Sequence, residues 1–283
     1  MAFLDSACRL YQSLFRHTHP EEAKLVGLHK SGQMEAFLDA YFSHEMEKGR
    51  EAVARFDRLA RGWKGTRVLD FGCGAGGLTF RLAEVCREAV GIDIEKVKVD
   101  HAIRMAAERG QENVRFVCYE GGTIPFGDSS FDCIFCVDVI EHLPDPAGFV
   151  AQFRRLLKPG GQLLLSFGPP WMHAHGKHMW AQLPGWWTHL MFPQSVVMRV
   201  CGFPPGTTWE KLGMHRLTVS MFRDVMRASG LKQVLLQELI KPVLWPLKLI
   251  PRLRELFISE VVGVYRKPGT VLARPEAECR ERS

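Results

Sequence analysis

A cluster of glycines between an apolar run and a helical pattern is the first place where this sequence could bind a ligand. Residues 70–77 read Asp-Phe-Gly-Cys-Gly-Ala-Gly-Gly. Glycines let the backbone approach a ligand closely, and the start of a helix offers free N–H groups. The spacing of Gly72, Gly74 and Gly77 also fits a dinucleotide-binding turn. Asp70 favours a different ligand, because a carboxylate before the turn repels a pyrophosphate and attracts a cation.

A second group of side chains that could do chemistry lies in residues 169–216. This segment is rich in histidine and tryptophan: His173, His175, His178, His189, Trp171, Trp180, Trp186, Trp187 and Trp209. Histidine is the usual side chain for removing a proton near neutral pH. His173 and His178 are the predicted bases, because they follow the preceding apolar strand most closely. Alternatively, these rings form the core of a helical cap, with the histidines at its solvent edge.

The elements that must position these residues alternate along the chain. Short apolar runs predict strands at 68–71, 89–94, 114–118, 131–137, 162–167, 234–240 and 257–265. Helical patterns lie between them, at 78–87, in a segment ending near residue 110, at 145–157 and at 218–229. Asp145 and Thr218 are the predicted N-caps of the last two helices. This alternation predicts a parallel sheet with helices on both faces, with ligands bound at the carboxyl ends of the strands.

Five stretches resemble, in order, those of class I S-adenosylmethionine-dependent methyltransferases of the small-molecule type 11 group. They are Val-Leu-Asp-Phe-Gly-Cys-Gly-Ala-Gly at 68–76, Val-Gly-Ile-Asp-Ile at 90–94, Ile-Pro-Phe through Ser-Phe-Asp at 124–132, Glu-His-Leu-Pro-Asp-Pro at 141–146 and Leu-Lys-Pro-Gly-Gly at 157–161. The resemblance implies a Rossmann-like, doubly wound α/β fold. Its mostly parallel sheet would have seven strands in the order 3-2-1-4-5-7-6, with helices on both faces.

The same resemblance, together with the texture of the sequence, divides the chain into five parts. We expect an N-terminal helical segment, a cofactor-binding core, a lid over the acceptor inserted after strand five, a C-terminal completion of the sheet and a flexible tail. Their expected bounds are 1–64, 65–168, 169–216, 217–267 and 268–283.

The resemblance also implies how S-adenosyl-L-methionine would be held. Asp70 and the backbone of Gly72 and Gly74 would bind its methionine part. Asp93 would accept hydrogen bonds from the ribose hydroxyls, for the same geometric reason that a dinucleotide site places an acid there. Ile94 would pack on the adenine.

The remaining implied contacts follow strands three and four. Glu120, Gly121 and Gly122 stand where the family usually has an aspartate followed by adenine contacts. Because Glu120 departs from that pattern, only its backbone contact is implied firmly. Val137 and Asp138 end strand four and would lie beside the methyl group of the cofactor.

Asp138, Glu141 and His142 resemble the Glu-x-x-Glu-His metal site of ubiquinone-biosynthesis O-methyltransferases and small-RNA 2′-O-methyltransferases, with aspartate as the first acid. On one helical turn the three side chains would share a face and could hold a divalent ion. The Glu-His-Leu-Pro-Asp-Pro run is also common in methyltransferases without a metal. A His175–His178 pair shows no third ligand. The sequence therefore predicts no metal.

Methyl transfer to a small-molecule acceptor, at oxygen, is the predicted reaction. The tryptophan-rich lid favours an apolar or ring-bearing acceptor such as a lipid, quinone, phenol or sugar. An RNA methyltransferase, a catalytically silent S-adenosylmethionine-binding regulator and a dinucleotide oxidoreductase are the alternatives. Against RNA, the sequence shows no appended RNA-binding module, and Gly-Pro-Pro-Trp at 168–171 follows strand five, not strand four.

Composition and charge predict a cytoplasmic protein with no nucleic-acid partner. The net charge is +6, 46% of residues are hydrophobic, and the lysines and arginines are scattered. Eight cysteines without a disulfide pattern fit a reducing compartment. The N-terminus lacks the apolar core of a signal peptide. The basic, proline-interrupted stretch 241–254 leaves weak contact with a membrane surface open, and the oligomeric state is also open.

Overall fold

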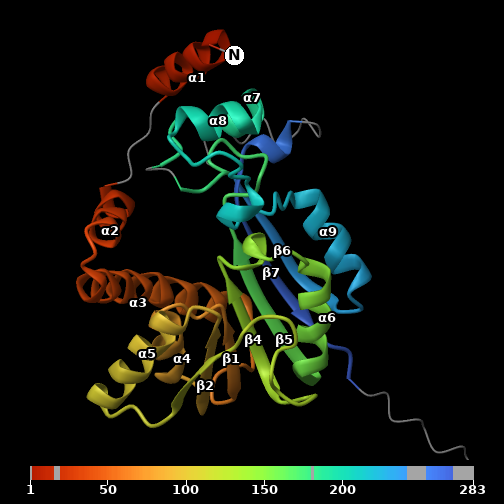
Figure 1. Cartoon of the computed structure of the whole chain (residues 1–283). Coiled ribbons are helices and arrows are strands. Elements are labelled where there is room, and N and C mark those ends of the chain that lie inside the picture. Colours follow the sequence, from red (N-terminus) through yellow and green to blue (C-terminus); the bar gives the residue numbers. More distant parts are fainter. Residues whose placement is uncertain (1, 16–19, 180–181, 241–252, 270–283) are drawn as a thin grey trace, which may run out of the picture.

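Seven strands form one sheet in the order β3-β2-β1-β4-β5-β7-β6, as the family resemblance predicts. The computed structural model describes residues 2–15, 20–179, 182–240 and 253–269 (Figure 1). The strands are β1 (Arg67–Phe71), β2 (Glu88–Asp93), β3 (Val114–Cys118), β4 (Phe131–Val137), β5 (Leu157–Phe167), β6 (Lys232–Ile240) and β7 (Ile258–Arg266). Five neighbouring strands are parallel, and β7 runs antiparallel to both β5 and β6.

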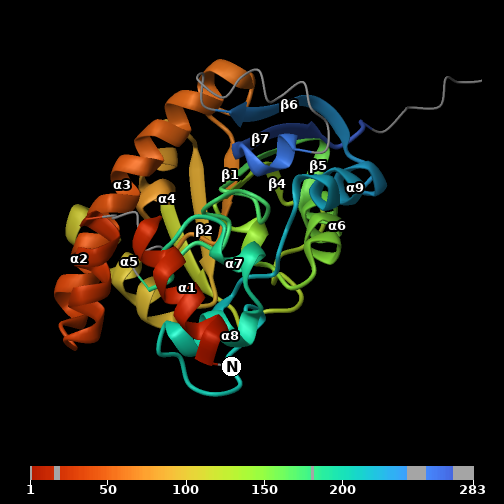
Figure 2. The same cartoon turned by 90° about the horizontal axis from the view of Figure 1, so that it is seen from above.

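Both faces of the sheet are covered by helices, because successive side chains of its central strands point to opposite faces. Val68 and Leu69 of β1 are both fully buried, but they belong to different core clusters. The cluster of Leu69 includes α6 (Pro146–Leu156) and α9 (Val219–Ala228), whereas that of Val68 includes α3 (Met34–Leu59) and α4 (Gly77–Ala83). Figure 2 shows these two helical layers on either side of the sheet.

The helix starts follow from capping. The side chain of Asp145 accepts a hydrogen bond from Gly148 N at 3.0 Å at the start of α6. Thr218 Oγ1 accepts one from Met221 N at 3.1 Å at the start of α9. Both caps satisfy backbone donors that a helix leaves free, and both confirm the sequence prediction.

Some predicted bounds differ from the observed ones. The helix after β1 ends at Ala83 and not at residue 87, and β5 begins at Leu157, five residues earlier than predicted. The Pro-Gly-Gly turn at 159–161 was expected to precede β5. Instead it lies within that strand, where Gly160 N donates to the carbonyl of Lys267 at 3.0 Å and Gly161 O accepts from Lys267 N at 2.8 Å. Pairing with the chain after β7 therefore overrides the local turn signal.

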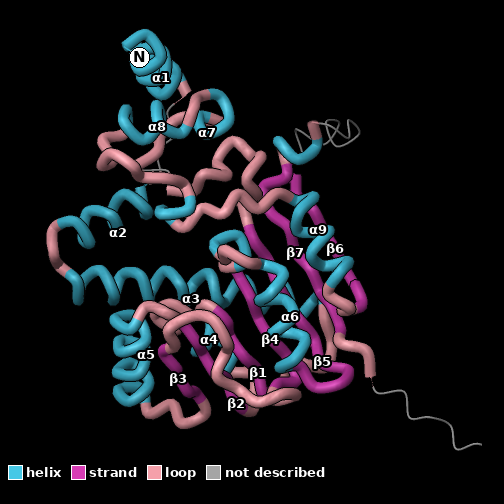
Figure 3. Tube along the Cα trace, turned by 45° about the vertical axis from the view of Figure 1, so that its right-hand side comes forward, coloured by secondary structure: helices cyan, strands magenta, loops and turns pink. Residues whose placement is uncertain are grey.

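The segment 169–216, called the lid below, follows β5 at the carboxyl ends of the parallel strands. It contains α7 (Thr188–Met191), α8 (Gln194–Val200) and a small core that includes Leu183 and Trp209. The N-terminal helix α1 (Ala2–Leu14) packs on α8, with an ion pair between Asp5 and Arg199 at 2.6 Å. Figure 3 shows α1 and the lid stacked at one end of the sheet.

Two further helices complete the layer that holds α3. Helix α2 (Pro20–Lys30) packs on α3, and α5 (Lys96–Arg109) packs on β2 and β3. No helix among the described residues is long and apolar enough to cross a membrane. The stretch 241–252, which carries most of the expected membrane contact, lies outside the described residues.

Candidate active site

The glycine turn joins β1 to α4 and carries a buried carboxyl group. Asp70 is 2% exposed, and its Oδ2 accepts a hydrogen bond from Thr79 Oγ1 at 2.6 Å. Burial raises the pKa of Asp70 to about 7, with a smaller contribution from the nearby charge of Asp93. Gly72 has a φ of 77° and lies against Val139, so a larger side chain does not fit there.

Glu45 on α3 lies directly against this turn. Its Oε2 accepts hydrogen bonds from Ala75 N at 3.0 Å and from Gly77 N at 3.4 Å. The Tyr41 hydroxyl, one helical turn earlier, lies near the same carboxyl group and favours its ionised form. Burial raises the pKa of Glu45 to about 8. Sequence analysis missed this residue, because no local motif marks a glutamate that reaches the turn from another element.

Asp93 at the end of β2 is fixed by two backbone donors. Its Oδ2 accepts from Gly74 N at 2.9 Å, and its Oδ1 accepts from Glu95 N at 2.8 Å. Ile94, which follows it, is 62% exposed. The carboxylate therefore holds a fixed position between the glycine turn and an open edge of the sheet.

The other residues predicted to contact adenine adjoin this edge. Tyr119 N donates to the carbonyl of Asp93 at 3.1 Å, and Glu120 follows with an exposed side chain. Gly121 and Gly122 have φ values of 86° and 73°, and no atom lies within 4 Å of a Cβ built on either. The structure thus brings these residues to the same side as Asp93, on an uncovered surface.

A cavity of about 730 Å³ extends from the glycine turn toward the lid. Of the predicted site residues, Asp70, Gly72, Val137, Asp138 and His178 line it. Its other lining residues include His44, Lys48 and Arg55 of α3, Met179 of the lid, and Ser259 and Glu260 of β7. The cavity therefore begins at the expected methionine position and ends under the lid.

Charged residues of the cavity wall are paired across elements. Lys48 Nζ lies 3.3 Å from Asp138 Oδ2, and Arg55 forms an ion pair with Glu260 of β7. Asp138 has a φ of 56°, which is rare for a residue other than glycine. This backbone turn directs its side chain toward α3.

The two predicted bases are in different surroundings. His178 lines the cavity, and its Nε2 lies 3.1 Å from the carbonyl oxygen of Pro169. Burial lowers the pKa of His178 to about 3, so its ring is neutral at physiological pH. His173 is not among the residues that line the cavity; its Nδ1 accepts a hydrogen bond from His175 N at 3.3 Å.

The described tryptophans of the lid do not line this cavity. Trp171 and Trp209 stack edge to face with centroids 5.5 Å apart in the lid core, and Trp186 is partly exposed. His189 packs against the rings of Trp171 and Trp209, with Nε2 2.7 Å from the Trp171 carbonyl oxygen. Trp171 and Trp209 thus lie in the core of the lid, as in the alternative interpretation of the sequence, but His189 is buried there and not at the solvent edge.

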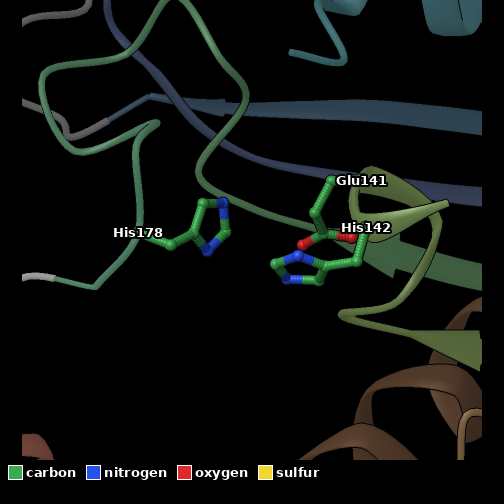
Figure 4. Close-up of side chains that lie close together, drawn as sticks. All are labelled: Glu141, His142 and His178. Carbon is green, nitrogen blue, oxygen red and sulfur yellow. The ribbon is translucent and has the colours of Figure 1, made fainter. Parts of the chain in front are cut away.

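Glu141, His142 and His178 form a separate cluster at the wall of the cavity (Figure 4). Glu141 and His142 lie on the short helix η1 (Ile140–His142), directly after β4. The ligand atoms of the three side chains all lie within 4.8 Å of one another. Asp138 is not part of this cluster, because its positive φ interrupts the helical turn on which the sequence analysis placed it.

Comparisons of sequence and of structure both found known proteins that are similar to this chain. Residues 69–165 match the family model described as a methyltransferase domain. The uncharacterized methyltransferase YcgJ of Bacillus subtilis is 39% identical over 99 residues, which are 35% of this chain and 39% of YcgJ. The ubiquinone biosynthesis O-methyltransferase of Coxiella burnetii is 36% identical over 103 residues, which are 36% of this chain and 44% of that protein. The chain thus spans less than half the length of either relative.

The similarity to solved structures extends over more of this chain than the similarity in sequence does. Phosphoethanolamine N-methyltransferase 2 of Haemonchus contortus superimposes with a TM-score of 0.54 at 17% identity, over 77% of this chain and 52% of that one. The family match identifies residues 69–165 as a methyltransferase domain, and the order of the seven strands agrees with the class I fold that the sequence predicts for the whole sheet.

Proposed function

We propose that this chain binds S-adenosylmethionine and transfers its methyl group to an oxygen atom of a small-molecule acceptor. The observation that carries the proposal is the set of three carboxyl groups, those of Glu45, Asp70 and Asp93, around one glycine turn. S-adenosylmethionine carries a sulfonium and an ammonium, which carboxylates attract. A dinucleotide pyrophosphate would be repelled by the same groups.

Asp93 is suited to hold the ribose. A carboxylate offers about four acceptor positions, and two of these already bind Gly74 N and Glu95 N. The remaining positions are available to the two ribose hydroxyls, and the backbone donors keep the group in place before the ligand arrives. Adenine would then cover the exposed Ile94 and approach the open backbone of Gly121 and Gly122.

The reacting end of the cofactor is expected beside Val137 and Asp138. The cavity leads from there to His178, which gives the acceptor room to approach the methyl group in line with the breaking S–C bond. The S–C electron pair moves to sulfur, which leaves as a neutral thioether, and the proton of the acceptor hydroxyl passes to water. Alignment and exclusion of water are then the main tasks of the protein.

Of the two predicted bases, His178 has the position to contact an acceptor. Its Nε2 is committed to the Pro169 carbonyl, so the proton lies on Nε2 and the Nδ1 lone pair is available. A neutral ring can accept a hydrogen bond from an acceptor hydroxyl. We assign no acceptor contact to His173, which does not line the cavity.

The cavity lining suggests an acceptor with both apolar and polar parts. Tyr41, Val139 and Met179 offer apolar surface, whereas Lys48 and Ser259 offer hydrogen-bond donors. The volume of about 730 Å³ suits a small molecule. Oxygen as the acceptor atom is supported by the similarity of the domain to a ubiquinone biosynthesis O-methyltransferase.

Transfer of a labelled methyl group tests this proposal. The purified chain is incubated with S-adenosylmethionine labelled in its methyl group and with separate pools of phenols, quinols, sugars, lipids and total RNA. We expect label in one small-molecule pool, equimolar formation of S-adenosylhomocysteine, and strongly reduced transfer by Asp70→Asn. Label in RNA alone would contradict the assigned acceptor class, and no transfer despite tight cofactor binding would contradict catalysis.

A further inference from the structure

Glu141 is buried without a full set of partners. The residue is 5% exposed, and Glu141 Oε1 accepts one hydrogen bond, from Gly168 N at 3.3 Å. Its Oε2 is buried and has no hydrogen-bond partner among the described residues. A buried carboxylate without a countercharge costs several kcal/mol. Asp138 adds further negative charge nearby.

The two neighbouring histidines are oriented by backbone carbonyls. His142 Nδ1 lies 2.9 Å from the Gly213 carbonyl oxygen, and His178 Nε2 lies 3.1 Å from that of Pro169. A carbonyl only accepts, so these nitrogens carry the ring protons. The lone pairs therefore remain on His142 Nε2 and His178 Nδ1. Figure 4 shows the Glu141 carboxyl group beside the His142 ring, with His178 on the lid opposite them. The two histidine rings meet edge to face, with centroids 5.1 Å apart.

This arrangement meets the requirements of a metal site. Histidines that bind a metal donate their other ring N–H to a carbonyl or a carboxylate, which fixes the tautomer and the ring orientation. A bound cation would also supply the missing countercharge for Glu141.

We propose that Glu141, His142 and His178 bind one divalent transition-metal ion, with zinc as the expected occupant. Two imidazole nitrogens and one carboxylate oxygen are a common ligand set of zinc sites that keep a fourth position open. Zinc bonds of about 2.0–2.2 Å place tetrahedral ligand atoms roughly 3.3–3.5 Å apart. The ligand atoms of the three side chains lie within 4.8 Å of one another, so a bound zinc ion would draw them closer together.

The fourth position of this site would face the acceptor, because His178 also lines the large cavity. This part of the inference rests on the proposed methyl transfer. An acceptor hydroxyl bound to the metal loses its proton to water more easily, and the resulting oxygen attacks the methyl group. The metal ion would thus activate the acceptor hydroxyl, a task that a histidine base would otherwise perform. It would also make acceptor binding and lid closure depend on each other, since two of its ligands precede the lid and one belongs to it.

The ligand set differs from the one considered in the sequence. Asp138 was grouped there with Glu141 and His142, but its side chain pairs with Lys48 on α3. His178, which lies 36 residues after His142 in the sequence, takes the place of Asp138 in the ligand set. Only the folded lid brings the third ligand to the other two.

Metal binding by the full chain tests the inference without any methyl acceptor. The purified protein is stripped with a chelator and titrated with zinc by calorimetry, and cobalt(II) serves as a spectroscopic probe of coordination. We expect one zinc ion per chain with micromolar or tighter affinity, and a visible absorption band of low-symmetry cobalt. Glu141→Gln and His178→Ala should each weaken zinc binding at least about tenfold.

One matched variant serves as the control. His173→Ala removes another histidine of the lid, and it should bind zinc like the unchanged protein. S-adenosylhomocysteine affinity shows that each variant is folded. No zinc binding, or equal zinc binding by Glu141→Gln and the unchanged protein, would overturn the metal site. Loss of S-adenosylhomocysteine binding by the unchanged protein would contradict the proposed function and leave the zinc result standing.

Discussion

Burial of the Asp70 carboxyl group lowers the stability of the folded protein and favours the binding of a cationic ligand. Its carboxyl group is buried, and its pKa is raised to about 7. A carboxyl group with a raised folded pKa costs stability at pH values above its unfolded pKa, because the folded state resists its ionisation. A cationic ligand removes this cost when it binds.

Replacement of Asp70 by asparagine should therefore separate stability from binding. Asparagine can still accept the hydrogen bond from Thr79, but it carries no charge. At pH 8 we expect Asp70→Asn to raise the melting temperature by about 2–4 °C per kcal/mol gained. Its affinity for S-adenosylhomocysteine should fall by about 1–3 kcal/mol. Thermal unfolding and calorimetry measure both, and unchanged ligand affinity would exclude Asp70 from the site.

Asp93 tests the nucleotide half of the site. Asp93→Ala removes the predicted ribose acceptor and the partner of Gly74 N, so the affinity for S-adenosylhomocysteine should fall by about 1–3 kcal/mol. Asp100→Ala on α5 is the matched control, because that exposed carboxylate pairs only with Lys96 among the contacts described. Equal affinities of the two variants would place the ribose elsewhere.

At the scale of elements, the close approach of α3 and α4 positions Glu45. Gly49 permits this approach, since a Cβ at that position would lie 2.9 Å from Leu78 Cα. Helix α3 thereby covers the glycine turn, and it also contributes Lys48 and Arg55 to the cavity wall. The helix thus belongs to the site as much as the turn does.

Gly49→Leu should push the two helices apart. Overpacking of this kind costs about 1–3 kcal/mol, and displacement of Glu45 should weaken S-adenosylhomocysteine binding as well. Gly27→Leu on α2 is the control, because nothing lies within 4 Å of a Cβ there. Denaturant unfolding and calorimetry compare the two variants; if Gly49→Leu behaved like Gly27→Leu, the contact between α3 and α4 would not position Glu45.

How far each element could be predicted depended on how local its signals are. The strand order followed from the family resemblance, whereas Asp70, Gly72 and Asp93 stand in contiguous motifs at the predicted ends of strands. Glu45 reaches the turn from a separate helix, and His178 meets His142 only after the lid has folded. Contacts between distant segments leave no local pattern, and the positive φ of Asp138 likewise depends on its surroundings.

For the whole molecule, buried carboxyl groups predict an unusual dependence of stability on pH. The pKa values of Asp70 and Glu45 are raised from 3.8 and 4.5 to about 7 and 8. The folded state therefore binds more protons than the unfolded state between those limits, and stability falls as pH rises. The buried His189 has the opposite effect on stability. Burial lowers its pKa from 6.5 to about 3, so the folded state becomes less stable as pH falls below 6.5.

Of Asp70, Glu45 and His189, only the two carboxyl groups still make stability depend on pH above pH 6.5. We expect the free energy of unfolding to fall between pH 6.5 and 8, as measured by denaturant unfolding at a series of pH values. A Glu45→Gln, Asp70→Asn double variant should show a flatter profile over that range. A rising profile for the unchanged protein, or the same slope in both, would contradict the assigned burial of these carboxyl groups.

The central claim is that the carboxyl-lined glycine turn binds S-adenosylmethionine and not a dinucleotide. Calorimetric titration of the full chain with S-adenosylhomocysteine, and separately with NAD, tests it most directly. We expect one binding site of micromolar affinity for S-adenosylhomocysteine and no measurable heat with NAD. Tight binding of NAD without binding of S-adenosylhomocysteine would contradict it.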